Sequence, residues 1–161
     1  MAWEFLSSTV LGSAGDTIDS GTIDAKLTLF AILGIKDSAT ANVKVQFNNV
    51  TSASYCTRYA ENGGSSVSNN NQTSIRIYQT GSGTDIERYI PMYIVNEPDQ
   101  EKLLIAQVNE STTSGAGTAP VRSEHYGKLA TTGSSITSIQ IINDTTGSFA
   151  ADSYLTVFGS D

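Results

Sequence analysis

Residues Val43-Lys44-Val45-Gln46-Phe47 give the clearest indication of the fold class of this chain. Three apolar side chains alternate with two polar ones, so an extended backbone places them on opposite faces. This period of two predicts a half-buried antiparallel strand. The same alternation recurs in residues 74–78, where Ile75 and Ile77 share one face, and in residues 154–158.

The rest of the chain repeats this rhythm between clusters rich in Ser, Thr, Asn and Gly. Further strands are predicted at residues 17–23, 26–35, 54–58, 86–95, 102–108, 121–128 and 136–142. Short strands at such spacing are typical of a sandwich. Helical periodicity is absent, and a short turn at 98–101 is the best exception. We therefore expect residues 1–161 to form one all-β domain, an antiparallel, jelly-roll-like β-sandwich of nine or ten strands.

Two details of the sheets can be predicted. Residues 26–35 and 102–108 are apolar on both faces, which indicates central strands covered on both sides. Pro91 interrupts the run 86–95, and because proline has no N–H to donate, that strand is expected at a sheet edge or a bulge.

Three segments lie outside the strand pattern. Residues 61–73 and 109–119 are nearly devoid of apolar side chains and are expected to project as long loops, either as connections, which we favour, or as binding loops. Residues 1–10 are expected to form an N-terminal arm. Its Trp3, Phe5 and Leu6 are the candidate interface residues: they either fold back to close the sandwich, which we favour, or anchor a neighbouring subunit.

Composition excludes several function classes. Nine Lys and Arg against 16 Asp and Glu give a net charge of −7, so we expect no nucleic-acid partner. The longest apolar stretch is far shorter than a membrane span, and the first residues do not resemble a secretory signal, so no membrane partner is expected. Cys56 is the only cysteine, which rules out an intramolecular disulfide. The polar surface is instead neutral, with 21 Ser and 19 Thr.

Catalytic chemistry has few candidates. His125 is the only histidine, and a Cys56–His125 dyad requires the fold to bring them together; we favour structural roles for both. The acidic residues are scattered. Asp16, Asp19 and Asp24 come closest to a cluster, but their spacing does not match a calcium loop. We therefore predict no catalytic, cofactor or metal site, and no enzyme.

The order of motifs resembles small β-rich virion proteins of tailed bacteriophages and related archaeal viruses. The resemblance extends from residue 20 to residue 159, and its most specific part is the ending, Gly147-Ser148-Phe149-Ala150-Ala151-Asp152-Ser153 followed by Leu155-Thr156-Val157-Phe158-Gly159. Upstream it includes Phe47-Asn48-Asn49, Arg58-Tyr59, Glu61-Asn62-Gly63 and Asn96.

This resemblance implies a jelly-roll-like module located on the virion. The compact chain favours a capsid decoration or cement subunit, or another head-surface subunit, which binds neighbouring coat proteins as a homo-oligomer, in our expectation a trimer. The alternative is a receptor- or glycan-binding knob, or a tail-associated adhesion module, that binds a host surface glycan. Sugar sites use exposed aromatic platforms, for which Tyr78, Tyr89, Tyr93, Tyr126 and Tyr154 are the candidates.

Overall fold

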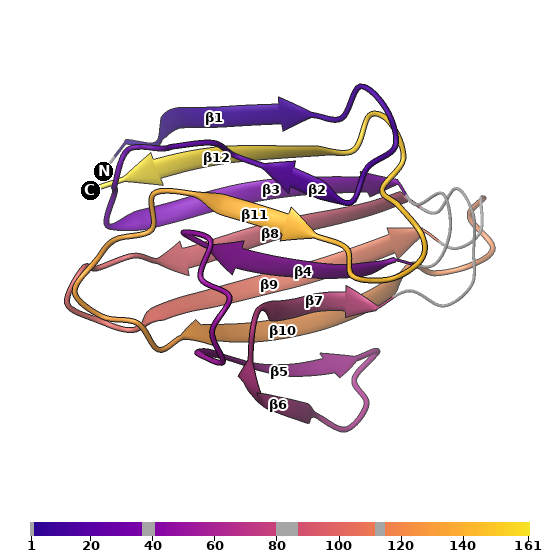
Figure 1. The fold of residues 1–161 in the computed structure, drawn as a ribbon. Coiled ribbons are helices and arrows are strands. Elements are labelled where there is room, and N and C mark those ends of the chain that lie inside the picture. The colour runs from indigo at the N-terminus through magenta and orange to yellow at the C-terminus, as the bar shows by residue number, and fades with distance from the viewer. Residues whose placement is uncertain (1, 37–40, 80–86, 112–114) are drawn as a thin grey trace.

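The computed structural model describes residues 2–36, 41–79, 87–111 and 115–161, and these form two antiparallel sheets packed face to face (Figure 1). The larger sheet has the strand order β1-β12-β3-β8-β9-β10-β5-β6, and the smaller has the order β2-β11-β4-β7. The strands are β1 Glu4–Val10, β2 Thr17–Asp19, β3 Thr28–Lys36, β4 Asn42–Phe47, β5 Tyr55–Glu61, β6 Val67–Gln72, β7 Ile75–Gln79, β8 Glu87–Val95, β9 Lys102–Ser111, β10 Val121–Leu129, β11 Ile139–Ile142 and β12 Tyr154–Ser160.

The chain winds back and forth between the sheets. Each strand of the smaller sheet is followed along the chain by one or more strands of the larger one. The predicted all-β sandwich is confirmed, with β1 and β6 as additional strands. Among the described residues, no helix is long and apolar enough to cross a membrane.

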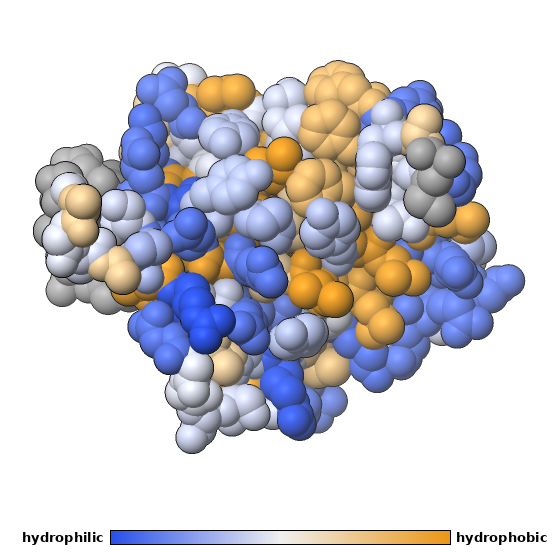
Figure 2. Space-filling model, turned by 180° about the vertical axis from the view of Figure 1, so that it is seen from behind, coloured by the Kyte–Doolittle hydropathy of each residue, from blue (hydrophilic) through white to orange (hydrophobic). Residues whose placement is uncertain are grey.

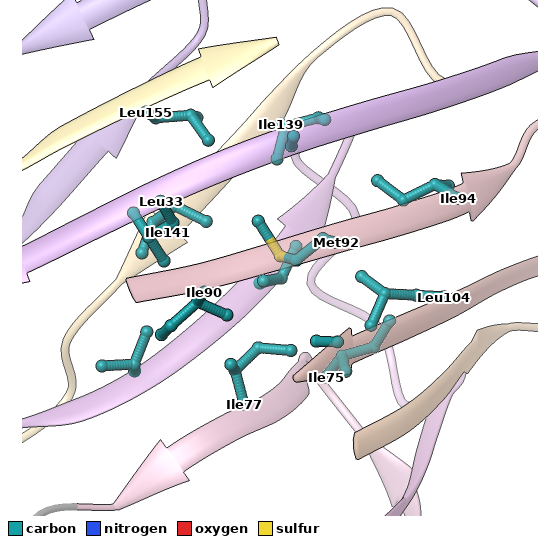
Figure 3. Close-up of a cluster of buried hydrophobic side chains, with 14 of the residues drawn as sticks. Leu33, Ile75, Ile77, Ile90, Met92, Ile94, Leu104, Ile139, Ile141 and Leu155 are labelled. Atoms are coloured by element: carbon teal, nitrogen blue, oxygen red, sulfur yellow. The ribbon is translucent and has the colours of Figure 1, made fainter. Parts of the chain in front are cut away.

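The core lies between the two sheets and follows the predicted alternation. Val43, Val45 and Phe47 of β4 are buried, as are Ile75 and Ile77 of β7. Side chains from both sheets point toward one another across this layer (Figure 3). One continuous hydrophobic cluster thus joins the smaller sheet to the inner face of the larger one.

The prediction that β3 and β9 are covered on both sides is wrong. In β9, buried and exposed residues alternate strictly, and Leu103 and Ile105 face outward. In β3, Leu29 and Leu33 are buried, whereas Phe30 and Ile32 between them are only partly covered. Nothing in the described chain packs over the second face, so the smaller sheet covers one side only.

The prediction for Pro91 is also wrong. Pro91 lies in the middle of β8, between β3 and β9, and stays in register with Ile32. The pairing with β9 is interrupted between Tyr89 and Met92 without a change of register. A gap in one hydrogen-bond ladder therefore accommodates the missing N–H, without an edge or a bulge.

Both predicted loops are shorter than expected. The segment 61–73 contains β6, which pairs with β5 through its backbone, and residues 109–111 extend β9. Residues 112–114 of the second predicted loop lie outside the described part of the chain. So does residue 86, the first residue of the strand predicted at 86–95, together with residues 80–85 before it. The N-terminal arm becomes strand β1, which pairs with β12 at the edge of the larger sheet.

Two buried polar side chains hold the connections at one end of the sandwich. The Asn96 side chain accepts a hydrogen bond from the Ile136 N–H and donates to the carbonyls of Lys26 and Ile136. The Lys102 ammonium donates to the carbonyls of Glu97, Pro98 and Gln100, which fixes the 98–101 turn. These bonds satisfy backbone groups that the sheets leave open.

Candidate functional site

The outer face of the larger sheet, the side turned away from the smaller sheet, is the most unusual surface of the molecule. Figure 2 looks onto it and shows hydrophobic side chains scattered in a broad band among pale polar ones. Large apolar or aromatic residues that are about half exposed make up much of it: Trp3, Phe5, Tyr89, Tyr93, Val95, Leu103, Ile105 and Tyr126. A patch of this extent on a sheet face marks an interaction site more often than a solvated surface.

The strand register places many of these side chains in one line across seven strands. We call this line the cross-strand row; in order from β1 to β5 it consists of Phe5, Phe158, Phe30, Tyr93, Ile105, Tyr126 and Arg58. Each member lies directly opposite the next on the neighbouring strand. Because residues opposite one another point to the same face, the row forms a continuous ridge.

Ring contacts hold the first part of the row. The ring centroids of Phe30 and Tyr93 are 4.7 Å apart, and those of Phe30 and Phe158 are 6.4 Å apart. Phe5 meets Phe158 edge-on at 6.1 Å, and Trp3 reaches to 5.9 Å from Phe30. Packed in this way, the rings form a preordered surface with little side-chain entropy left to lose on binding.

The side chains of the three candidate interface residues lie on different faces of the sheet. A register shift between Phe5 and Ser7 turns Leu6 toward the core, where it packs partly buried. Strand β1 thus lies against the sandwich, paired with β12. Trp3 and Phe5, in contrast, stay on the outer face, with Phe5 61% exposed. The bulge therefore lets one short segment both seal an edge of the core and present two aromatic rings.

Charges on the outer face are largely paired within the chain. The Arg122 guanidinium lies 3.0 Å from the Glu124 carboxylate, and the Lys128 ammonium lies 2.9 Å from that of Glu101. The hydrogen bond to Glu101 raises the pKa of Lys128. These pairs leave the face nearly neutral, although the chain as a whole carries −7.

Two shallow depressions flank Tyr89 on the outer face. The first has a volume of about 450 Å³ and combines the Tyr89 ring with amide, guanidinium and carboxylate side chains; its lining includes Pro91, Gln107, Asn109, Arg122 and Glu124. The second, of about 480 Å³, shares Tyr89 and Asn109 and is also lined by Lys36, Asp152 and Tyr154. An aromatic ring beside amide and charged groups is a combination that fits a polar ring-shaped ligand.

The tyrosines proposed as platforms do not all lie on this face. Tyr89, Tyr93 and Tyr126 are exposed there, and Tyr154 lies over Gly34, its partner on β3. Tyr78 is buried instead, in the smaller sheet. Its sequence environment does not reveal this, because it ends an alternating run whose inner positions are Ile75 and Ile77.

Tyr78 belongs to a buried charged cluster that the sequence did not indicate. The Arg88 Nε lies 3.1 Å from the Glu110 Oε2, both side chains are almost completely buried, and the Arg88 guanidinium lies 4.6 Å from the Tyr78 ring centre. Burial, followed by the hydrogen bond to Glu110, raises the pKa of Tyr78. Arg88 and Glu110 lie opposite each other on β8 and β9, which explains how they meet.

The Cys56–His125 dyad is not formed. Cys56 pairs with Lys128 on the outer side of β5, whereas His125 points into the core and pairs with Tyr59. The His125 Nδ1 donates to the Arg76 carbonyl at 3.1 Å, so its Nε2 accepts from the Ser123 hydroxyl at 3.0 Å. The sequence analysis did not identify Ser123 as the partner of His125. The available signal was their spacing, because residues two apart on a strand share a face.

The Ser123–His125 pair lacks two properties of an activated nucleophile. The second imidazole nitrogen faces a carbonyl, where a carboxylate would stabilise the protonated ring. Burial also lowers the pKa of His125 to about 4, which makes it a weak base at neutral pH. The pair is best described as a satisfied hydrogen-bond network in the core, with the Tyr59 ring stacked on the imidazole at 5.4 Å.

The acidic candidates serve local structure. Asp19 accepts hydrogen bonds from the Gly21 N–H and the Gln140 amide, and Asp16 accepts one from the Asn143 amide. Asp24 is exposed. Within residues 2–36, 41–79, 87–111 and 115–161, no three metal-binding side chains gather into a site.

No protein-family model, curated protein or solved structure matches this chain.

Proposed function

We propose that this protein is a non-enzymatic structural subunit of a virion, located on the capsid surface or at the tail. It acts as a capsid decoration or cement protein, which assembles as a homo-oligomer, binds neighbouring coat subunits and stabilises the particle. The virion location rests on the resemblance of its motif order to small virion proteins. The assembly role rests on one observation, the exposed cross-strand row on the outer face.

The outer face has the physical properties of an assembly contact. Its apolar and aromatic side chains gain free energy when they are buried, at roughly 25 cal/mol per Å² of apolar area. Its ion pairs are already formed within the subunit, so burial of the face does not require new partners for them. The rings are held by neighbours in register and lose little freedom on docking.

Binding to particles tests this proposal. Virus particles that carry this protein are stripped of it, the purified protein is added back, and occupancy and the temperature of genome release are measured. We expect stoichiometric occupancy and a higher release temperature, with both effects lost in Tyr93→Lys. Val67→Lys, which changes an exposed residue on β6 outside the row, serves as the matched control. Absence of binding by the unmodified protein would refute the proposal.

A second candidate function is glycan binding at the depressions beside Tyr89, the receptor-binding alternative. The Tyr89 ring, the Asn109 and Gln107 amides and the Arg122–Glu124 pair favour it. A carbohydrate array with soluble protein tests it. Saturable binding that disappears in Tyr89→Ala but persists in Tyr126→Ala would support this function, whereas an array without binding would refute it for the sugars displayed.

A further inference from the structure

We propose that the partner of the outer face is a second copy of this chain, docked face to face about a two-fold axis that passes through Tyr93 parallel to β8. This inference rests on the proposed assembly function and specifies the partner. Three observations support it: the area of the patch, the composition of the cross-strand row along its length, and the distribution of charge beside the row.

The area suits a dimer. Five aromatic side chains on this face, Trp3, Phe5, Tyr89, Tyr93 and Tyr126, are each about half exposed. With 150–250 Å² for each aromatic side chain, they alone contribute roughly 500 Å² of accessible surface. The aliphatic residues and the half-buried rings of Phe30 and Phe158 bring the total toward the ~800 Å² per partner of a standard stable interface.

The row is complementary to itself when its direction is reversed. Tyr93 has three members of the row on each side, and beyond Arg58 the register continues to the small side chain of Ser68 on the edge strand β6. A two-fold axis along β8 places Tyr93 against the partner's Tyr93 and Phe158 against the partner's Tyr126. Phe30 then meets the partner's Ile105. At the ends, the Phe5 ring receives the partner's Arg58, a cation–π contact.

The alternative two-fold axis, along the row, is disfavoured. It would place Arg58 against the partner's Arg58 and bring like charges together in a buried contact. With the axis along β8, Lys128 faces the partner's Ser160 and Glu124 faces the partner's Thr156. Glu87, at the start of β8 itself, faces the partner's Glu87, and its charge is paired within its own chain with Lys36 at 3.5 Å. Such an arrangement keeps the strands of the two copies roughly aligned, which is a common way for sheets to pack.

Sedimentation equilibrium of the full chain over a range of concentrations tests the pairing. We expect a monomer–dimer equilibrium whose dissociation constant increases at least about tenfold in Tyr93→Lys, the loss of about 1.4 kcal/mol or more. Val67→Lys should leave the dissociation constant unchanged. Because Tyr93 is 54% exposed, circular dichroism and the urea midpoint should show that the variant still folds.

Charge exchange tests the register of the two copies. Phe5→Lys should weaken the dimer because its ammonium would face the partner's Arg58, whereas Phe5→Glu should retain or strengthen it. Phe5→Glu combined with Arg58→Glu should weaken it again, and Phe5→Lys combined with Arg58→Glu should restore it. Failure of this cycle in an otherwise Tyr93-dependent dimer would overturn the proposed axis.

Other outcomes separate this inference from the proposed function. A protein that stays monomeric, forms the trimer expected from the sequence, or forms a dimer insensitive to Tyr93→Lys would overturn the pairing. If such a protein still binds particles through the outer face, the assembly function stands. A Tyr93-dependent dimer that does not bind particles would leave the pairing intact and remove the capsid role.

Discussion

Phe30 on β3 and Tyr93 on β8 lie directly opposite each other, with ring centroids 4.7 Å apart, on the face of the larger sheet that no other part of the described chain covers. Aromatic pairs in such registered positions usually stabilise a sheet. Here they also form the centre of an exposed ridge. The same contact therefore contributes to the fold and to the surface available for a partner.

The outer and inner faces should respond very differently to truncation. Phe47 is completely buried, so Phe47→Ala is expected to lower the free energy of unfolding by about 3–5 kcal/mol through lost burial and the cavity left behind. Tyr93→Ala removes an exposed ring and should cost about 1 kcal/mol. Urea denaturation measures both. Equal losses would mean that the outer face is part of the folding core.

Glu110→Gln should destabilise the protein by about 3–5 kcal/mol, because it leaves the buried Arg88 guanidinium without its carboxylate. Replacing both members, as in Arg88→Met with Glu110→Leu, should recover much of this loss. The matched control is Glu124→Gln, which breaks the exposed pair with Arg122 and should change stability by less than about 1 kcal/mol. Urea midpoints of the parent protein, the two single variants and the double variant show whether the buried pair contributes in this way.

Protonation of His125 should make the protein acid-sensitive. The unfolded chain takes up a proton near pH 6.5, whereas folded His125 stays neutral down to about pH 4 because burial lowers its pKa. The contribution of His125 to the free energy of unfolding is therefore fully present above pH 6.5, and about 3 kcal/mol of it is lost as the pH drops toward 4.

His125→Gln tests this account, since glutamine can still donate to the Arg76 carbonyl but does not titrate. The variant should be less stable than the parent protein at pH 7. Its free energy of unfolding should, however, change little between pH 6.5 and 5, where few carboxylates titrate. Stability curves measured by urea at several pH values compare the two proteins. Identical slopes would assign the acid sensitivity to other groups.

Gly34 is required because the Tyr154 ring lies over it. A Cβ at position 34 would come within 2.2 Å of the Tyr154 Cε1, so Gly34→Ala should cost about 1–3 kcal/mol. In a Tyr154→Ala background the same change should cost little, which gives a coupling energy of similar size in a double-mutant cycle. Gly12→Ala, with open space around position 12, is the control.

Asn96→Leu should lower stability by about 3 kcal/mol or more. It removes three hydrogen bonds that link the chain near Lys26 to Ile136, and it leaves their backbone groups buried without partners. Asn70→Leu, at an exposed position on β6, should change stability little. Hydrogen exchange at the Ile136 amide, slow in the parent protein and faster in Asn96→Leu, locates the effect; unchanged exchange would contradict it.

The amino-acid pattern alone identifies the class of fold and the inner faces of most strands. Alternation in 43–47 and 74–78 identified Val43, Val45, Ile75 and Ile77 as core residues, because side chains two apart on an extended backbone always share a face. It did not identify β6, whose polar residues pair with β5 through backbone hydrogen bonds that are independent of side-chain type.

Which apolar face of a strand stays open depends on how the two sheets pack, and local sequence does not encode this. A run such as 102–108 has the same sequence whether its outer side is buried or exposed, so Leu103 and Ile105 were expected to be covered. Likewise, Phe5, Phe30 and Arg58 are distant in the chain. Their alignment depends on strand order and register, which long-range backbone pairing sets and local periodicity does not encode.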